Sequence, residues 1–209
     1  MSVLESKEIL RRLATEGDLA IVPIINPKQI GNEAVDLRLG AMAAVIRGSS
    51  QTSVDPRQYA EAEAKGGHTR EQRIHRKLEH ISVPFAEPLV LHAGSLTLVP
   101  TLEWVRLPAD LQGVVTARSS WGREGLGVAT AAFIHPCYNG TVTLELTNFG
   151  QIPIILYPGL RIAQIAFYRV DDSNPCPDGK SSQFDLSFEA TAGNVTDGDE
   201  GFIPLPPTT

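Results

Sequence analysis

The feature that most constrains the fold is a run of short apolar stretches between residues 88 and 170, separated at regular intervals by turn-forming residues. Glycine, proline and asparagine interrupt the run, for example at Tyr157-Pro158-Gly159. Short strands with frequent turn signals are typical of antiparallel sandwiches, jelly rolls and barrels. The sequence therefore predicts a mainly β fold, with strands near residues 89–91, 96–99, 104–107, 114–116, 127–130, 141–147, 154–157 and 162–168.

The N-terminal part adds one helix and one further strand. Residues 4–17 predict a short helix, with Ser6 as the N-cap and Gly17 as the residue that ends it. Residues 34–39 alternate strictly between apolar and charged side chains, which predicts a half-buried strand. Asn139 and Gly140 tolerate positive φ, so this pair predicts a hairpin turn before the strand at 141–147.

Two segments depart from this pattern. Residues 47–84 are mostly polar and predict a surface excursion, with a short helix near 56–65 and a basic cluster of Arg70, Arg73, Arg76 and Lys77. Such a cluster is most often a solvated face. Residues 171–209 are rich in Pro, Gly, Asp and Ser, and predict a tail that is mobile unless it docks on a ligand or a neighbour. We expect one domain over residues 1–170, followed by this tail.

Charge and hydropathy exclude several classes of protein. The net charge of −6 lacks the basic surplus of a general nucleic-acid binder. No apolar run approaches the roughly 20 residues that span a bilayer, so no membrane partner is expected. The N-terminus lacks the order of basic, apolar and small residues of a signal peptide. A cytoplasmic protein is the default expectation.

Cysteine and histidine usage argues against a metal site in the protein itself. Cys137 and Cys176 are too few for a disulfide scaffold, and two reduced thiols are expected. None of the five histidines has a Glu two residues later, and neither cysteine has a second Cys three residues later. The chain therefore lacks the ligand pattern of a zinc-dependent cytidine deaminase. It also has no P-loop, no Rossmann fingerprint and no nucleophile elbow.

Two segments carry side chains suited to chemistry. Residues 117–127 place Arg118, Ser119, Ser120 and Arg123 in one turn, where guanidinium groups, hydroxyls and backbone amides can hold phosphate. Taken alone, such a turn is more often an ordinary surface turn. Residues 132–148 include a strand whose polar face carries Glu145. Taken alone, that carboxylate is most often solvated on the wet face of a sheet.

These two segments resemble the core motifs of the dCTP deaminase family, a branch of the trimeric dUTPase superfamily. Residues 118–126 resemble the family's phosphate-binding serine motif, and residues 140–146 resemble its catalytic strand. Residues 157–164 resemble the next superfamily motif, and residues 6–13, 34–40 and 90–94 also match. The likeness covers residues 4–46 and 85–170, and the order and spacing of its pieces make it specific.

The resemblance implies a dUTPase-like β-barrel or jelly roll that assembles as a homotrimer, with sites between subunits. It implies deamination of dCTP to dUTP and ammonia, without a metal at the base. Glu145 would move protons between water and the leaving amine, helped by Arg123, Ser119 and the carbonyl of Ala132. The residues implied in binding the deoxycytidine nucleotide are Arg118, Ser119, Ser120, Arg123, Ile134, His135, Tyr138, Gln164 and Lys180. Mg²⁺ would be bound through the triphosphate, and Tyr138 would pack under the deoxyribose.

Two departures from the family pattern bear on these roles. His135 stands where the family has an aspartate that contacts the sugar 3′-hydroxyl and, in dUTPases, activates the hydrolytic water. An imidazole can bond a hydroxyl but cannot supply the same carboxylate. The tail segment that closes over the nucleotide in the family is matched only loosely, by Lys180 to Phe184.

Two rival functions remain open: His135 counts against the first, whereas His135 and the altered tail motivate the second. The first is a dUTPase, or a bifunctional enzyme that deaminates dCTP and also releases pyrophosphate. The second is a nucleotide-binding regulatory protein that has the trimeric fold without catalysis. Release of pyrophosphate would indicate the first, and binding without turnover would indicate the second.

Overall fold

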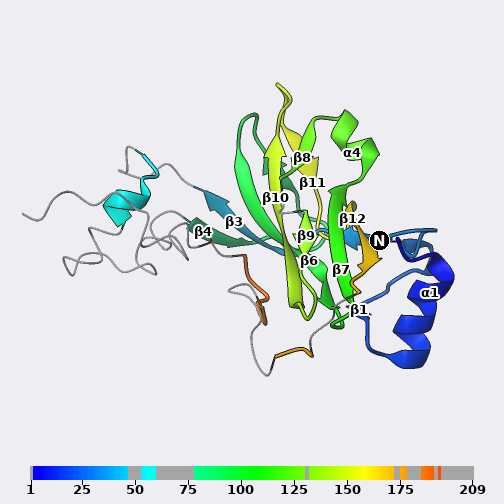
Figure 1. The fold of residues 1–209 in the computed structure, drawn as a ribbon. Helices are drawn as coiled ribbons and strands as arrows, with labels where there is room; N and C mark the ends of the chain where they lie inside the picture. The colour runs from blue at the N-terminus through cyan, green and yellow to red at the C-terminus, as the bar shows by residue number, and fades with distance from the viewer. Residues whose placement is uncertain are drawn as a thin grey trace, which may run out of the picture.

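The computed structural model describes residues 2–46, 53–59, 78–129, 132–171, 175–177, 185–190 and 193. Its strands form three antiparallel groups around one apolar core, with the N-terminal helix on the outside (Figure 1). Within the described residues, no helix is long and apolar enough to cross a bilayer. The prediction of a mainly β fold with a short N-terminal helix is confirmed.

The largest group is a six-stranded sheet. Its strand order is β4 (Leu78–Ser82), β3 (Met42–Ile46), β6 (Leu96–Arg106), β10 (Asn139–Asn148) and β8 (Leu126–Val128), and β1 (Ala20–Val22) also pairs with β6. The last residues of the expected surface excursion thus form β4, an edge strand paired with β3.

Two smaller sheets complete the β structure. The four-stranded sheet has the order β2 (Val35–Arg38), β12 (Arg161–Arg169), β7 (Leu111–Ala117) and β9 (Phe133–Ile134). The two-stranded sheet pairs β11 (Ile154–Leu156) with β5 (Leu89–Leu91). Short helical segments between strands include η2 (Pro27–Gln29) and α4 (Ser119–Arg123).

Alternation in the sequence decides which face of each strand is buried. Val35, Leu37 and Leu39 are fully buried, as the pattern of residues 34–39 predicts. In β10, Val142, Leu144 and Leu146 are buried, while Thr143, Glu145 and Thr147 are less so. These apolar faces meet in the main core, so the polar faces of the same strands remain available for a site.

The strands expected at 96–99 and 104–107 are one continuous strand, β6, which passes through Pro100. Proline cannot donate a backbone hydrogen bond, and it is tolerated in a sheet at a bulge. The register of β6 against β10 shifts between Thr141 and Thr143, opposite Pro100 and Trp104. This bulge lets the long strand continue past the proline.

The expected hairpin turn at Asn139-Gly140 is wrong. Both residues belong to β10, where they pair with Arg106 and Val105 of β6. The chain turns earlier, at Pro136 and Cys137, and Cys137 has a φ of 67°. Gly140 is needed for space, because an added Cβ would lie 3.1 Å from the hydroxyl of Tyr138.

The N-terminal helix differs from its prediction at its start. It consists of α1 (Ser6–Arg11) and a π-helical continuation, η1 (Arg12–Glu16). Ser6 is the first helical residue and Glu5 is the N-cap, because the carbonyl of Glu5 accepts from the N–H of Ile9 at 3.0 Å. Gly17 ends the helix in the left-handed conformation, as predicted, with a φ of 65°.

Within the expected excursion, residues 56–59 are helical, and the rest of the helix predicted at 56–65 lies outside the described residues. The basic cluster of Arg70, Arg73, Arg76 and Lys77 also lies outside them.

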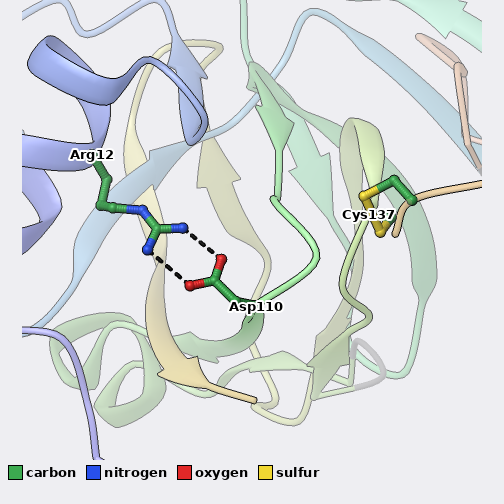
Figure 2. The surroundings of a disulfide bond; sticks show 4 residues. Arg12, Asp110 and Cys137 are labelled. Atoms are coloured by element: carbon green, nitrogen blue, oxygen red, sulfur yellow. Dashed lines mark hydrogen bonds and ion pairs between the residues drawn. A yellow bond between two sulfur atoms is a disulfide. The ribbon is translucent and has the colours of Figure 1, made fainter. Parts of the chain in front are cut away.

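The expectation of two reduced thiols is wrong, because Cys137 and Cys176 form a disulfide with a Cα–Cα distance of 5.3 Å (Figure 2). The two residues are 39 positions apart, so no local pattern indicates the pairing. The turn after β9 and the path of the tail bring them together.

Part of the tail docks on the chain's own large sheet. The N–H of Leu186 donates to the carbonyl of Asn139 at 2.7 Å, and the hydroxyl of Thr141 donates to the carbonyl of Ser187 at 2.8 Å. The ring of Phe188 lies 4.5 Å from the ring of Trp104, between centroids. These contacts lie at the start of β10 and the end of β6, and Ala190 also contacts His80 of β4.

Candidate active site

The candidate phosphate-binding turn begins where β7 leaves the four-stranded sheet. The N–H of Arg118 donates to the carbonyl of Ile162 at 3.0 Å, and α4 starts at the next residue. The indole N–H of Trp121 donates to the carbonyl of Arg161 at 3.1 Å and fixes the turn against β12. Ser119 and Ser120 are exposed at the start of α4, so their hydroxyls can reach a ligand.

A shared carboxylate holds two arginines beside this turn. Asp36 of β2 lies 3.3 Å from Nε of Arg118 and 2.9 Å from a terminal nitrogen of Arg161. Pairing of β2 with β12 places Asp36 opposite Gln164 and therefore next to this cluster. Asp36 and Arg161 lie in segments that resemble the family motifs, but the resemblance assigned neither residue a role at the site. Their position on the polar face of a half-buried strand could have indicated that they lie near the site.

A buried polar network holds the backbone of Asp36 in place. Glu103 is fully buried, and its carboxylate accepts from the side chain of Gln29 at 2.7 Å and from the N–H of Arg38 at 2.8 Å. Gln29 also donates to the backbone carbonyl of Asp36 at 2.9 Å. Burial raises the pKa of Glu103, and these hydrogen bonds act in the opposite direction. The network fixes the backbone of β2 under the candidate phosphate site.

Gln164, a predicted substrate-binding residue, lines a surface hollow next to the arginines. The hollow has a volume of about 360 Å³, and its other lining residues are Gly31, Asn32, Glu33, Ala34 and Asp36. Gln164 lies in β12 between Asp36 of β2 and Thr116 of β7. The structure therefore places Gln164 in the same neighbourhood as Arg118.

Glu145 lies in the other large sheet, in the middle of β10. It pairs with Leu98 of β6, and its backbone carbonyl accepts from the N–H of Ala129 at 2.8 Å. The side chain is half-buried, and burial raises its pKa because the charged form loses hydration. A carboxyl with a raised pKa is better suited to exchange protons near neutral pH.

The segment from residue 132 to 138, which includes β9 and the turn after it, carries four predicted site residues. The carbonyl of Ala132 accepts from the N–H of Val115 at 2.8 Å, and Ile134 pairs with Gly113. His135 is exposed. Tyr138 is buried, and its hydroxyl donates to the carbonyl of Thr141 at 2.6 Å. Burial raises the pKa of this hydroxyl, which is committed to the chain itself.

The predicted site residues thus fall into groups on different elements. Arg118, Ser119, Ser120 and Arg123 lie together at α4, whereas Glu145 lies on β10. Arg123 is exposed and has no ion pair or side-chain hydrogen bond to any residue that the structure describes. Lys180 lies outside the described residues. Among the described residues, no group of three or more His, Cys, Asp or Glu side chains is placed to hold a metal ion.

The structure superposes on the 2′-deoxycytidine 5′-triphosphate deaminase from Agrobacterium tumefaciens with a TM-score of 0.60 and 24% sequence identity. The match covers 81% of this chain and 49% of that chain.

A family model described as dCTP deaminase-like matches residues 3–170. The chain belongs to the dCTP deaminase-like family. It is 34% identical over 203 residues to a protein of Methanosphaera stadtmanae named dCTP deaminase, dUMP-forming, with 97% of this chain and 96% of that protein covered. It is 38% identical over 167 residues to a protein of Natronomonas pharaonis named dCTP deaminase, with 79% of each chain covered.

Proposed function

We propose that this chain hydrolytically deaminates dCTP and releases ammonia. The observation that carries the proposal is Glu145, a half-buried carboxyl whose pKa is raised by burial, on the strand that resembles the family's catalytic strand. The names of the relatives from Methanosphaera stadtmanae and Natronomonas pharaonis support the same activity. Attack of water at C4 of cytosine needs a proton acceptor that works near neutral pH.

In the proposed reaction, Glu145 takes a proton from water as the water oxygen bonds to C4 of cytosine. The bond from C4 to the exocyclic nitrogen then breaks, and Glu145 returns the proton so that ammonia leaves. Ser119 and the carbonyl of Ala132 position the water, and Arg123 orients the carboxylate. The exposure of Ser119, Arg123 and Ala132 is compatible with these roles.

The triphosphate would bind at the turn that starts α4. Arg118, Ser119 and Ser120 present a guanidinium and two hydroxyls there, and Gln164 lines the neighbouring hollow. These donors suit phosphate oxygens, and Mg²⁺ needs few protein ligands when the phosphates supply most of its coordination. When bound, Mg²⁺ would neutralise part of the triphosphate charge. Ile134, His135 and Tyr138 form the loop that we assign to the base and sugar.

For the product, we propose that hydrolysis continues to dUMP and pyrophosphate. The resemblance implies dUTP as the product, with this bifunctional reaction as an alternative. The Methanosphaera stadtmanae relative, which matches nearly the whole chain, is named dUMP-forming, and this favours the alternative. The proposal requires the imidazole of His135 to take the place of the aspartate that activates the hydrolytic water in dUTPases.

We also propose that a second copy of the chain completes the site. Glu145 and the turn at α4 lie on different elements, and Arg123 projects from the surface. The structure exposes large apolar side chains, among them Val90, Phe149, Ile152 and Ile155, and Val90 pairs with Ile155 across the small sheet. A surface of this kind suits contact with another subunit. Sedimentation at several concentrations would detect the trimer that the resemblance implies.

The direct test is a chromatographic assay with dCTP and Mg²⁺ that follows dUTP, dUMP, pyrophosphate and ammonia together. We expect ammonia and dUMP with an equal amount of pyrophosphate. Accumulation of dUTP alone would support a monofunctional deaminase and refute the second hydrolysis. Binding of dCTP without ammonia release would refute deamination and favour the regulatory alternative.

A further inference from the structure

The disulfide joins the candidate sugar-binding loop to the tail. Cys137 lies between His135 and Tyr138, two residues that we assign to nucleotide binding. Cys176 lies in the tail, 39 residues further along the chain. A bond between them restrains the loop and the tail together, so its formation or reduction acts on the candidate site directly.

Other contacts already hold the loop in its fold without the disulfide. The N–H of Leu107 donates to the carbonyl of Tyr138 at 2.8 Å, and the N–H of Cys137 approaches the carbonyl of Pro108 at 3.4 Å. Tyr138 belongs to the main core. The fold around residue 137 therefore has its own support, and we expect it to persist when the disulfide is reduced.

The described part of the tail is anchored in two places, at Cys176 and at residues 185–190, where Asp185 and Ala190 are buried. Residues 185–190 contact the start of β10 through Leu186, Ser187 and Phe188. The carbonyl of Ala190 also lies 2.9 Å from a ring nitrogen of His80. The disulfide is the covalent link that holds the described residues 175–177 against the loop. Its loss would leave the tail attached through these contacts alone.

The bond is open to attack from solvent on one side. Cys176 is exposed, whereas Cys137 is half-buried. Exposed disulfides exchange with external thiols more readily than buried ones. In reducing compartments, disulfides are usually transient and serve redox sensing. The cytoplasmic location expected from the sequence would therefore favour a regulatory over a permanent bond.

We propose that Cys137 and Cys176 form a redox modification site that controls the tail and the candidate sugar-binding loop. An external dithiol attacks the exposed sulfur of Cys176, and a mixed disulfide forms as the sulfur of Cys137 leaves as a thiolate. The second thiol of the reductant then displaces Cys176. The chain gains two electrons and two protons as two thiols, and the reductant becomes a disulfide.

The effect on turnover rests on the proposed function. In the oxidised form the tail is held against the loop, which restricts both the movement of the loop around a nucleotide and the movement of the tail. Reduction removes this restraint. We expect kcat/KM for dCTP to rise about fivefold or more on reduction, which is at the lower end of typical coupling between two sites.

The first measurement counts thiols in the full-length protein under native conditions. The chain has only two cysteines, so alkylation followed by mass spectrometry reports on this pair alone. We expect no modified thiol after mild oxidation and two after treatment with dithiothreitol, with the same monomer mass on a non-reducing gel. Free thiols after oxidation, or a disulfide between chains, would overturn the proposal.

The second measurement compares tail cleavage by a protease and dCTP turnover in the two redox states. Both should increase on reduction. Cys176→Ser should behave as the reduced wild type and should not respond to dithiothreitol, which makes it the matched control. A reducible bond that changes neither cleavage nor turnover would be a structural link, and the proposal would be wrong. Absence of deamination in both states, with the expected thiol counts and cleavage, would refute the proposed function and leave the redox control of the tail standing.

Discussion

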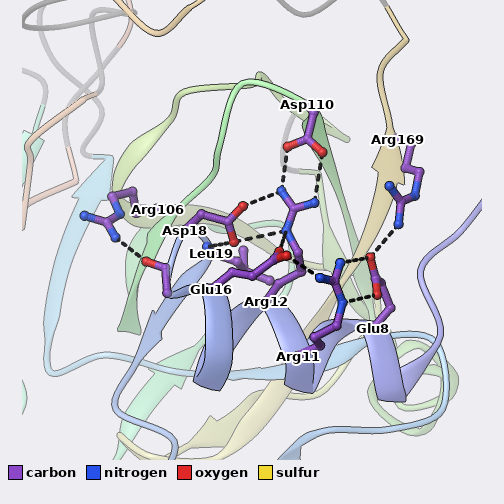
Figure 3. Close-up of polar contacts among 10 residues, drawn as sticks. Glu8, Arg11, Arg12, Glu16, Asp18, Leu19, Arg106, Asp110 and Arg169 are labelled. Carbon is purple, nitrogen blue, oxygen red and sulfur yellow. Dashed lines mark hydrogen bonds and ion pairs between the residues drawn. The ribbon is translucent and has the colours of Figure 1, made fainter.

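The cluster around Arg12 and the turn at α4 use arginine in opposite ways. The side chain of Arg12 is 6% exposed, and its guanidinium lies 2.6 Å from both Asp18 and Asp110 (Figure 3). Arg123 is exposed and forms no ion pair with any other residue in the described ranges. Arg12 is ion-paired within the chain, whereas Arg123 is available to a ligand.

This difference separates a structural cation from a functional one. The bidentate pair of Arg12 with Asp110 joins the N-terminal helix to the turn between β6 and β7, which also contacts Cys137 (Figures 2 and 3). Removing one partner of such a pair leaves a poorly hydrated charge behind. At α4, removal of an exposed side chain leaves the fold intact. Substitutions in the Arg12 cluster should therefore lower stability, whereas substitutions at the α4 turn should lower turnover.

The largest effect is expected at the candidate site, from Glu145→Gln. The amide cannot exchange the proton, so deamination of dCTP should fall by about 10²–10⁴-fold while nucleotide binding persists. Steady-state ammonia release and a dCTP binding titration measure the two quantities. Glu87→Gln, an exposed change in a turn, is the matched control and should retain wild-type turnover. Normal deamination by Glu145→Gln would remove Glu145 from the mechanism.

Arg123→Gln should separate turnover from stability. We expect a loss of roughly 10²-fold in kcat/KM, comparable to removing one donor that stabilises developing charge. The urea midpoint should stay at the wild-type value, because the side chain is exposed. An unfolding midpoint that falls together with activity would mean that Arg123 supports the fold.

Arg12→Met should show the reverse behaviour. We expect the free energy of unfolding to fall by about 2–3 kcal/mol, below the range for fully buried pairs because both aspartate partners are 36% exposed. Urea denaturation followed by fluorescence measures it. Arg11→Met is the matched control: that side chain is 46% exposed, and its replacement should leave the midpoint nearly unchanged. Equal losses in the two variants would show that burial of the pair does not decide its contribution.

The smallest effects concern pH, where the two regions shift carboxyl pKa values in opposite directions. Arg12 lowers the pKa of Asp110, whereas burial raises that of Glu145. The stabilisation from Asp110 is present above the unfolded pKa of 3.8 and is lost as pH falls through the lower folded value. The stability difference between wild type and Asp110→Asn should therefore hold above about pH 5 and shrink as pH falls through 3.8 toward the lower folded pKa. A constant difference would mean that the ion pair contributes nothing.

For Glu145 the sign is reversed. A raised folded pKa means that stability is greatest below the unfolded pKa of 4.5 and declines as pH rises through the folded value. Catalysis needs the ionised carboxylate, so kcat should decline on the acid side with a midpoint above 4.5. A pH profile of kcat with saturating dCTP tests this, and a midpoint at or below the ordinary value would contradict it.

Local patterns were sufficient for much of the fold. The alternation of Val35, Leu37 and Leu39 predicts their burial, because a strand turns successive side chains to opposite faces. The same rule places Glu145 on the polar face of β10. The motif at residues 118–123 indicates the exposed turn with its hydroxyls and cations. Each of these features depends on residues close together in the chain.

Features that depend on distant residues were decided only by the tertiary structure. Asp36 reaches Arg118 because β2 and β7 both pair with β12, and the Cys137–Cys176 bond needs the tail to return to the loop after β9. Neighbouring sequence does not encode which strand lies alongside which, or where a polar tail docks. The sequence by itself determined the mainly β fold and the buried faces, and it predicted most residues of the candidate site without testing them. The tertiary structure decided their partners, because strand pairing and burial depend on the whole chain.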